Sequence, residues 1–545
     1  MCLIGCAAIT IASLCSPNEE TEDTNLTAAA ATTPPTENTS SRFTSGPALV
    51  LYIAAGKLLL HLLTAARYGI FRDEMYYLAC SQHMAWGYVD HPPLTVLIAW
   101  IARHVFGESP LAIRLLPALA GAALVWLTGK LAREMGGGRF AQVLAALAVV
   151  VVPIYLLMHH WLTDNAWEPL MWMGCIWLVV RAINTGDARY WLWFGVLAGL
   201  SFENKYSIAF LLLGVLVGVL LGPERRFLSS RYLWLGVLAC AIIALPNLLW
   251  QIRNHFPFLE LIHNIRMGNR DIVRGPVAFV ADQALIIHPI LAPLWIGGLI
   301  WLLFGRHGRR YRPLGWTFVV VLTALIVLKA KNYYVAPVYP MMFAAGAVGF
   351  EGLTRQRWVW TRSVYAALVV VAGAVFVPYS MPILSPENFI HYQKAIGLEP
   401  PKAENQNNGP LPQYFADEFG WEEMVREVAR VYHSLPPGEQ ARTAIFSNGW
   451  GQAAAVDFYG SRYGLPPAIS KHNNYWLWGP RNYTGEIMII LGSDGRGDRE
   501  HFQSVEAVGR VEHPYSRRDT HFTIWLCRGS KFNLQAAWPR MEKYN

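Results

Sequence analysis

The stretch PLAIRLLPALAGAALVWLTGKL, at residues 110–131, decides the fold class. It is an almost unbroken apolar run, and about 20 apolar residues in a helix cross the hydrocarbon core of a bilayer. A basic segment with Lys130, Arg133 and Arg139 follows, and a second run, FAQVLAALAVVVVPIYLLM, begins at residue 140. Apolar runs joined by short basic turns are typical of a protein that crosses a membrane repeatedly.

The composition of the 545-residue chain supports the same interpretation. Hydrophobic residues make up 54% of the chain, charged residues make up 15%, and there are 22 tryptophans. The net charge of +8 lies in short loops between apolar runs, where it acts as an orientation signal, so we expect no nucleic-acid partner. The seven cysteines show no metal-ligand spacing, although Cys80 and Cys527 are a candidate pair.

Apolar runs recur along residues 47–378 and predict an all-α polytopic membrane domain with about eleven spanning helices. Loops rich in arginine and lysine alternate with loops that are not, and the positive-inside rule places the basic loops in the cytoplasm. The predicted spans lie near 47–67, 110–131, 140–158, 166–183, 188–203, 205–222, 232–250, 285–304, 314–329, 333–350 and 361–378. The remaining loops and the tail are then predicted to lie on the opposite face.

The two ends of the chain differ from this apolar region. Residues 16–46 are rich in Thr, Ala, Pro, Asn and Glu, and we expect residues 1–46 to be a disordered extension. A misassigned start codon is the alternative explanation for this stretch. Residues 379–545 are predicted to form a soluble α/β domain on the outer face, with a helix over 421–432. Its predicted strands cover residues 441–447, 485–492 and 520–526.

Acids and bases gather in the loops of the predicted outer face. Carboxylates can take a proton from a nucleophile, and cations can stabilise the charge of a leaving phosphate. Each residue alone has an ordinary explanation as a loop residue or a helix cap, but several clusters on one face favour a functional site. The clusters are FRDEMYY at 71–77, GYVDHPP at 87–93, HHWLTDN at 159–165, FENKY at 202–206 and KAKNYY at 329–334.

Residues 47–378 resemble glycosyltransferase family 39, which comprises the dolichyl-phosphate-mannose protein mannosyltransferases and bacterial relatives such as the aminoarabinose transferases of lipid A modification. The resemblance rests on Asp73-Glu74, on Asp90-His91-Pro92-Pro93, on Leu162-Thr163-Asp164 and on Lys331-Asn332-Tyr333-Tyr334. It implies a GT-C fold in a bacterial inner membrane, with the tail in the periplasm. It also implies transfer of a sugar from a polyprenyl-phosphate donor, with inversion, to an acceptor in a protein, lipid A or a glycan.

The resemblance implies roles for the acidic residues and for the first loop. Asp73 matches the proposed catalytic base, and Glu74 would orient the acceptor or hold Asp73 in place. Asp164 matches a second acidic position that supports the site. His91, Pro92 and Pro93 are expected to shape the first loop rather than react.

The resemblance also implies a phosphate site. Lys205, Lys331 and Tyr334 match positions that would contact the donor phosphate. The family usually has Leu-Thr-Lys at the first lysine, whereas this chain has Glu203-Asn204-Lys205. The extra carboxylate of Glu203 is expected to weaken the contact between Lys205 and the phosphate.

Several alternatives stay open. No cofactor is expected, since lysines can stabilise the leaving group, but a divalent cation near Asp73 and Asp164 is an alternative. Lys57 and His61 lie one turn apart within the first span and would either form an interhelical pair or face the donor phosphate. At the level of function, the rivals are a transporter or flippase of lipid-linked saccharides and a non-catalytic subunit in envelope assembly.

Overall fold

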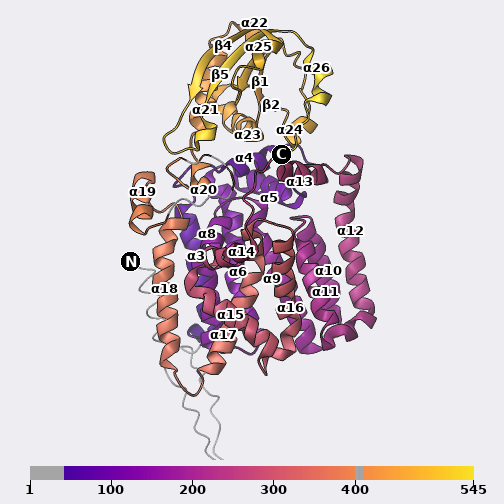
Figure 1. Cartoon of the computed structure of the whole chain (residues 1–545), viewed down its shortest axis with the longest axis vertical. Coiled ribbons are helices and arrows are strands. Elements are labelled where there is room, and N and C mark those ends of the chain that lie inside the picture. The colour runs from indigo at the N-terminus through magenta and orange to yellow at the C-terminus, as the bar shows by residue number, and fades with distance from the viewer. Residues whose placement is uncertain (1–41, 399–403, 406, 408) are drawn as a thin grey trace, which may run out of the picture.

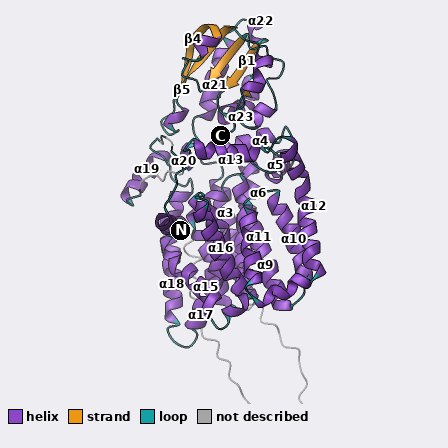
Figure 2. Cartoon of the chain, turned by 45° about the vertical axis from the view of Figure 1, so that its right-hand side comes forward, coloured by secondary structure: helices purple, strands orange, loops and turns teal. Residues whose placement is uncertain are grey.

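The computed structural model describes residues 42–398, 404–405, 407 and 409–545. The predicted N-terminal extension therefore lies almost wholly outside the described residues. Long helices stand side by side in a bundle, and a small sheet with its own helices lies over one end of this bundle (Figure 1). Figure 2 shows that the strands are confined to that end.

Each predicted span coincides with at least one helix of the bundle. The starts of these helices follow local chemistry: the Ser45 and Ser109 side chains accept hydrogen bonds from the first-turn amides of Ala48 and Ala112, and a proline follows in each case. The bundle contains α3 (Gly46–Thr64), α6 (Pro110–Glu134), α7 (Arg139–Val151), α8 (Pro153–Met158), α9 (Glu168–Thr185), α10 (Arg189–Phe202), α11 (Ile208–Leu220), α12 (Arg231–Arg253), α14 (Pro276–Ile287), α15 (Ala292–Phe304), α16 (Arg312–Val327), α17 (Tyr339–Leu353) and α18 (Trp360–Ser380).

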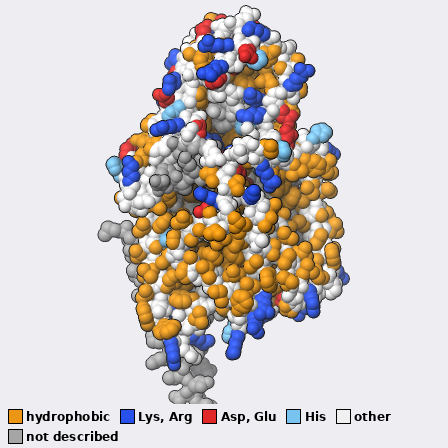
Figure 3. Space-filling model, in the orientation of Figure 1, with side chains coloured by type: hydrophobic (Ala, Val, Ile, Leu, Met, Phe, Trp, Pro, Cys, Tyr) orange, Lys and Arg blue, Asp and Glu red, His pale blue; other side chains and the backbone are white. Residues whose placement is uncertain are grey.

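The bundle has the surface of a membrane protein. Its flank is a continuous apolar band, and lysines and arginines gather at the end away from the sheet (Figure 3). Within the described residues, 6 helices are long and apolar enough to cross a membrane, or up to 8 if each bent pair is one span. The predicted number of about eleven is not confirmed, because helices such as α10 and α17 have only 14 and 15 residues.

Small residues set the closest helix contacts in the bundle. A Cβ at Gly195 of α10 would lie 2.0 Å from the carbonyl oxygen of Gly236 in α12, so the two backbones touch. Gly346 of α17 meets the backbone of Leu294 in α15 in the same way, at 2.0 Å. Because lipid tails are as apolar as the side chains, helices in a membrane gain from such close van der Waals packing.

Short helices lie between the bundle and the sheet (Figure 1). They belong to the loops predicted to face outward, and they are α4 (Arg72–Cys80), α5 (Leu94–Ile101) and α13 (Pro257–Met267). Helices α19 (Pro386–Ala395) and α20 (Gln413–Ala416) then lead from the bundle toward the sheet. The loops with the sequence motifs are therefore enclosed between two folded regions.

The sheet has five strands in the order β2-β1-β3-β5-β4. Strand β1 (Thr443–Ser447) is parallel to β2 (Ile469–Ser470) and to β3 (Ile487–Leu491), whereas β5 (Phe522–Ser530) is antiparallel to β3 and to β4 (Phe502–Val511). Helices α21 (Trp421–His433), α23 (Trp450–Tyr459) and α24 (Asn474–Leu477) complete this region. The predicted α/β character, the helix at 421–432 and three strands are confirmed, and β2 and β4 were not predicted.

One hydrophobic core joins the sheet region to the first outer loop. Met75 of α4 and Val96 of α5 lie in the same buried cluster as Val425, Ala454 and Ile489. A separate core fills the bundle. Cys80 and Cys527 are both buried free thiols, so the candidate disulfide is wrong: each lies inside packed structure instead of facing the other.

Candidate active site

Asp73 lies in the first turn of α4, where its side chain keeps 36% of its exposure. Its Oδ1 accepts a hydrogen bond from Nε of Arg72 at 3.2 Å. Burial by the surrounding protein raises the pKa of Asp73, although the positive charge of Arg72 opposes this shift. A carboxylate that is reachable and more basic than usual suits general-base chemistry.

Glu74, the neighbour of Asp73, faces the protein interior and is fully buried. Its carboxylate accepts hydrogen bonds from Arg114 Nη2 at 2.7 Å, from the Phe71 amide at 2.9 Å and from the Leu162 amide at 3.0 Å. Arg114 in turn contacts Glu418 at 3.2 Å. These contacts hold the first two outer loops against the tail. Glu74 therefore stabilises the backbone on which Asp73 lies, and none of these contacts involves the Asp73 side chain.

Asp164 and Lys205 lie together at the next outer turn. Lys205 Nζ is 3.5 Å from Asp164 Oδ2 and 3.2 Å from Glu168 Oε2, and it also donates to Asn165. Its ammonium lies over the ring of Tyr334 at 4.9 Å. Glu168 is therefore a partner of Lys205 that the sequence pattern did not indicate. Glu203 forms no ion pair with Lys205 in the described structure, and one of its carboxylate oxygens is buried without a partner.

Lys331 occupies a second position rich in charge. Its Nζ lies 3.0 Å from Glu404 and 3.2 Å from Asp271, and Arg270 approaches Glu404 to 3.7 Å. Burial by itself would raise the pKa of Glu404, but the charges of Lys331, Arg72 and Arg270 lower it to about 2. Glu404 is thus an anion held among cations, one of which, Lys331, is a residue that the family resemblance places at the donor phosphate.

Tyr77 of α4 lies near carboxylates of both the first and the second outer loop. Burial raises the pKa of Tyr77 in α4, and the nearby negative charges of Asp164, Asp90 and Asp73 raise it further. We call the charged side chains at this end of the bundle the outer charged cluster. It consists of Arg72, Asp73, Asp164, Lys205, Lys331 and Glu404.

The Asp90-His91-Pro92-Pro93 element packs beside this cluster. His91 is buried, and its Nε2 lies 3.5 Å from Asp90 Oδ1. Asp90 accepts a hydrogen bond from Tyr76 at 3.2 Å, and Pro93 precedes the first residue of α5. The enclosed position of His91 fits a residue that shapes the loop, a role that stays a prediction for His91, Pro92 and Pro93.

Comparison with known proteins gives matches of three kinds. The family profile described as dolichyl-phosphate-mannose-protein mannosyltransferase matches residues 90–250. Lipid A galacturonosyltransferase RgtD of Rhizobium johnstonii is 27% identical over 279 residues, which are 48% of this chain and 56% of that protein. The crystal structure of ArnT from Cupriavidus metallidurans bound to undecaprenyl phosphate superposes with a TM-score of 0.60 at 14% identity, covering 87% of this chain and 97% of that one. The apo form of ArnT gives a TM-score of 0.59.

The resemblance to the GT-C glycosyltransferases is therefore confirmed. The likeness to ArnT shows a shared fold, and it extends over the tail as well as the bundle, since it covers 87% of the chain. This chain spans only 56% of the length of the curated relative RgtD.

A buried polar cluster lies deeper in the helical bundle. Lys57 Nζ lies 3.4 Å from the carbonyl oxygen of Tyr155 and 3.4 Å from Nδ1 of His159. The ring of His61 lies 6.2 Å from that of His160, and both of its nitrogens are buried without a partner. Lys57 therefore connects α3 to α8. Of the two alternatives, an interhelical contact or a position facing the donor phosphate, the structure shows the interhelical contact for Lys57.

Sequence reasoning missed three members or supports of the site. Arg114 and Glu168 each lie within an apolar run, and a charged residue in such a run is itself an indication of a functional or structural role. Glu404 lies in a stretch without a recognisable motif. Among the residues that the structure describes, no group of three or more His, Cys, Asp or Glu side chains is arranged to hold a metal ion.

Proposed function

We propose that this chain transfers a sugar from a polyprenyl-phosphate donor to an acceptor hydroxyl, by a single displacement with inversion. The observation that carries the proposal is the outer charged cluster, in which the accessible carboxylate of Asp73 pairs with Arg72, Lys205 pairs with Asp164 and Lys331 pairs with Glu404. The site lies at one end of the apolar bundle, so a lipid-anchored donor can enter it from the bilayer. The names of RgtD and of ArnT bound to undecaprenyl phosphate support the same class of reaction.

In the proposed reaction, Asp73 takes the proton from the acceptor hydroxyl as its oxygen attacks the anomeric carbon. The bond between that carbon and the phosphate oxygen breaks, and polyprenyl phosphate leaves with the electron pair. Lys331 and Lys205 stabilise the charge that appears on the phosphate, with Tyr334 beside them. In this structure the carboxylates of Glu404 and Asp164 pair with Lys331 and Lys205, and the donor phosphate would take the place of these carboxylates. Lysines in this role need no metal cofactor.

We also propose an orientation. The lysines and arginines at the end of the bundle away from the sheet would lie in the cytoplasm, as the positive-inside rule requires. The outer charged cluster and the sheet would then face the periplasm of a bacterial inner membrane. Cysteine labelling of the sheet region in intact cells tests this orientation.

The test of the function is release of polyprenyl phosphate from a panel of polyprenyl-phosphate sugars in liposomes, with crude cell envelope as acceptor. Asp73→Asn is compared with Asp494→Asn, an exposed aspartate of the sheet region. We expect one donor to turn over, a loss of about 100-fold or more in Asp73→Asn, and no change in Asp494→Asn or with EDTA. Equal turnover in both variants would exclude Asp73 as the base, and movement of intact donor across the bilayer without cleavage would favour a flippase.

A further inference from the structure

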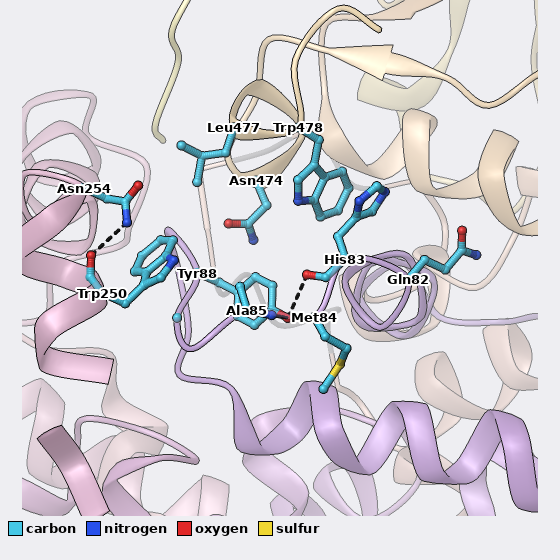
Figure 4. A pocket seen from close by; sticks show the side chains of 11 residues that line it. Gln82, His83, Met84, Ala85, Tyr88, Trp250, Asn254, Asn474, Leu477 and Trp478 are labelled. Carbon is cyan, nitrogen blue, oxygen red and sulfur yellow. Dashed lines mark hydrogen bonds between the residues drawn. The ribbon is translucent and has the colours of Figure 1, made fainter. Parts of the chain in front are cut away.

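A cavity of about 540 Å³ lies apart from the outer charged cluster, between the first outer loop, the end of α12 and α24 (Figure 4). This volume falls within the roughly 300–1,000 Å³ of small-molecule sites. Trp250 and Trp478 lie on opposite sides of the cavity, and Tyr88 lies between them. Aromatic side chains from three separate parts of the chain therefore line the cavity.

The aromatic walls are held in place by the surrounding structure. A Cβ at Gly87 would lie 2.5 Å from the ring of Trp250, so the absence of a side chain there lets the indole rest on the loop backbone. The ring of Trp478 stacks on that of His83 at 4.2 Å. Fixed aromatic side chains bind a ligand with little loss of conformational freedom.

The polar groups of the cavity are neutral. The lining residues in the described structure include neither lysine, arginine, aspartate nor glutamate. Burial and the nearby Arg481 lower the pKa of His83, so its imidazole is neutral at physiological pH. The amide of Asn254 lies at the cavity, where its Nδ2 donates to the carbonyl oxygen of Trp250 and its Oδ1 can accept a hydrogen bond. The lining itself therefore supplies no cation for a phosphate or a carboxylate.

A neutral sugar ring matches this lining. Its faces present C–H groups that pack on aromatic rings, and its edges present hydroxyls that both donate and accept hydrogen bonds. A lipid chain would leave Oδ1 of Asn254 without a hydrogen-bond donor, at a cost in free energy. Among small ligands and lipid chains, a saccharide satisfies both the aromatic faces and the neutral amides.

Asn474 connects the cavity to the loop that carries the candidate base. It is fully buried, and its Nδ2 donates to Tyr76 Oη at 2.7 Å and to Asp90 Oδ1 at 3.1 Å. Tyr76 lies on α4, one turn after Asp73. With a helical rise of about 1.5 Å per residue, the end of α4 at Cys80 lies roughly 10 Å along the helix from Asp73, which is farther than one sugar ring spans, and the cavity lies beyond that end.

We propose that this cavity binds a neutral saccharide unit of the acceptor. The unit lies one or more sugars away from the hydroxyl that reacts at Asp73, so the acceptor is an oligosaccharide or a glycolipid. The assignment of the saccharide to an acceptor rests on the proposed function, whereas binding of the saccharide in the cavity does not.

The test is saturation-transfer NMR on the full chain in nanodiscs, with disaccharides of glucose, galactose and mannose as probes and digalacturonate as the charged comparison. We expect at least one neutral disaccharide to bind and digalacturonate to bind more weakly. Trp478→Ala and Trp250→Ala should each weaken binding about tenfold or more. Trp193→Ala, which removes an indole that is 60% exposed on α10, should leave binding unchanged.

Further measurements separate the cavity from the catalytic step. Trp478→Phe keeps an aromatic face and should bind between wild type and Trp478→Ala, which guards against a fold defect in the alanine variant. Asp73→Asn should bind the disaccharide as wild type does. Absence of neutral-sugar binding by the wild type, or wild-type affinity in both alanine variants, overturns the proposal. Donor cleavage in that case would leave the proposed function standing.

Discussion

Asp73 should set the acid limb of the pH–rate profile. Since a general base must be deprotonated, kcat/KM should fall as the pH drops through the pKa of Asp73, which burial raises above its ordinary value of 3.8. The positive charge of Arg72 lowers that pKa, so Arg72→Gln should move the acid limb to higher pH. The measurement is donor cleavage at low substrate across about pH 4 to 8. A limb that moves to lower pH in Arg72→Gln would contradict the assignment.

Asp73 and Glu74 are adjacent carboxylates with opposite expected effects on stability. Glu74 is fully buried against Arg114, and removing one partner of a buried pair costs about 3–5 kcal/mol. Glu74→Gln should therefore lower the thermal unfolding temperature in detergent by several degrees, whereas Asp73→Asn should leave it close to wild type. Equal melting of both variants would show that the pair between Glu74 and Arg114 does not stabilise the fold.

The carboxylate of Glu404 is expected to compete with the donor phosphate for Lys331. This carboxylate lies on Lys331 and Arg270, where the proposal places the donor phosphate. Glu404→Gln should remove this competing anion and tighten binding of polyprenyl phosphate about fivefold or more. The matched control is Glu439→Gln, which breaks an ion pair of the same 3.0 Å length with Arg528 in the sheet region. Weaker binding in Glu404→Gln would show that Glu404 supports the phosphate site.

The elements that sequence predicts best are those with a strong local pattern. Helix α21 repeats its apolar residues at helical spacing, and β1 and β3 are fully buried strands between turn signals. Strand β4 lies at the edge of the sheet, where its exposed polar residues hide the strand pattern. The partners of Arg114 are unpredictable for another reason: Glu418 is 304 residues away along the chain, and only folding brings them together.

At the scale of the whole molecule, ion pairs and a shared hydrophobic core connect the tail to the bundle. Arg72 of the first outer loop pairs with Asp417 at 3.8 Å, and Arg114 of the bundle pairs with Glu418. A single core spans α4 and the helices of the sheet region. Loss of activity on removing the tail would therefore not distinguish an enzyme from an assembly subunit, because the bundle would lose its own support. The substitution Asp73→Asn makes that distinction.

The full chain should unfold in one transition. Ending the chain at residue 378 would leave Arg114 buried without Glu418 and would expose the apolar face of α4 to water. We therefore expect the truncated chain to melt at least about 10 °C below wild type or to fail to accumulate. In the full chain, helix content and tryptophan fluorescence should report the same midpoint, because a shared core makes the two regions cooperative. Two separate midpoints, or a truncated chain that melts like wild type, would show that the bundle and the sheet region are independent domains.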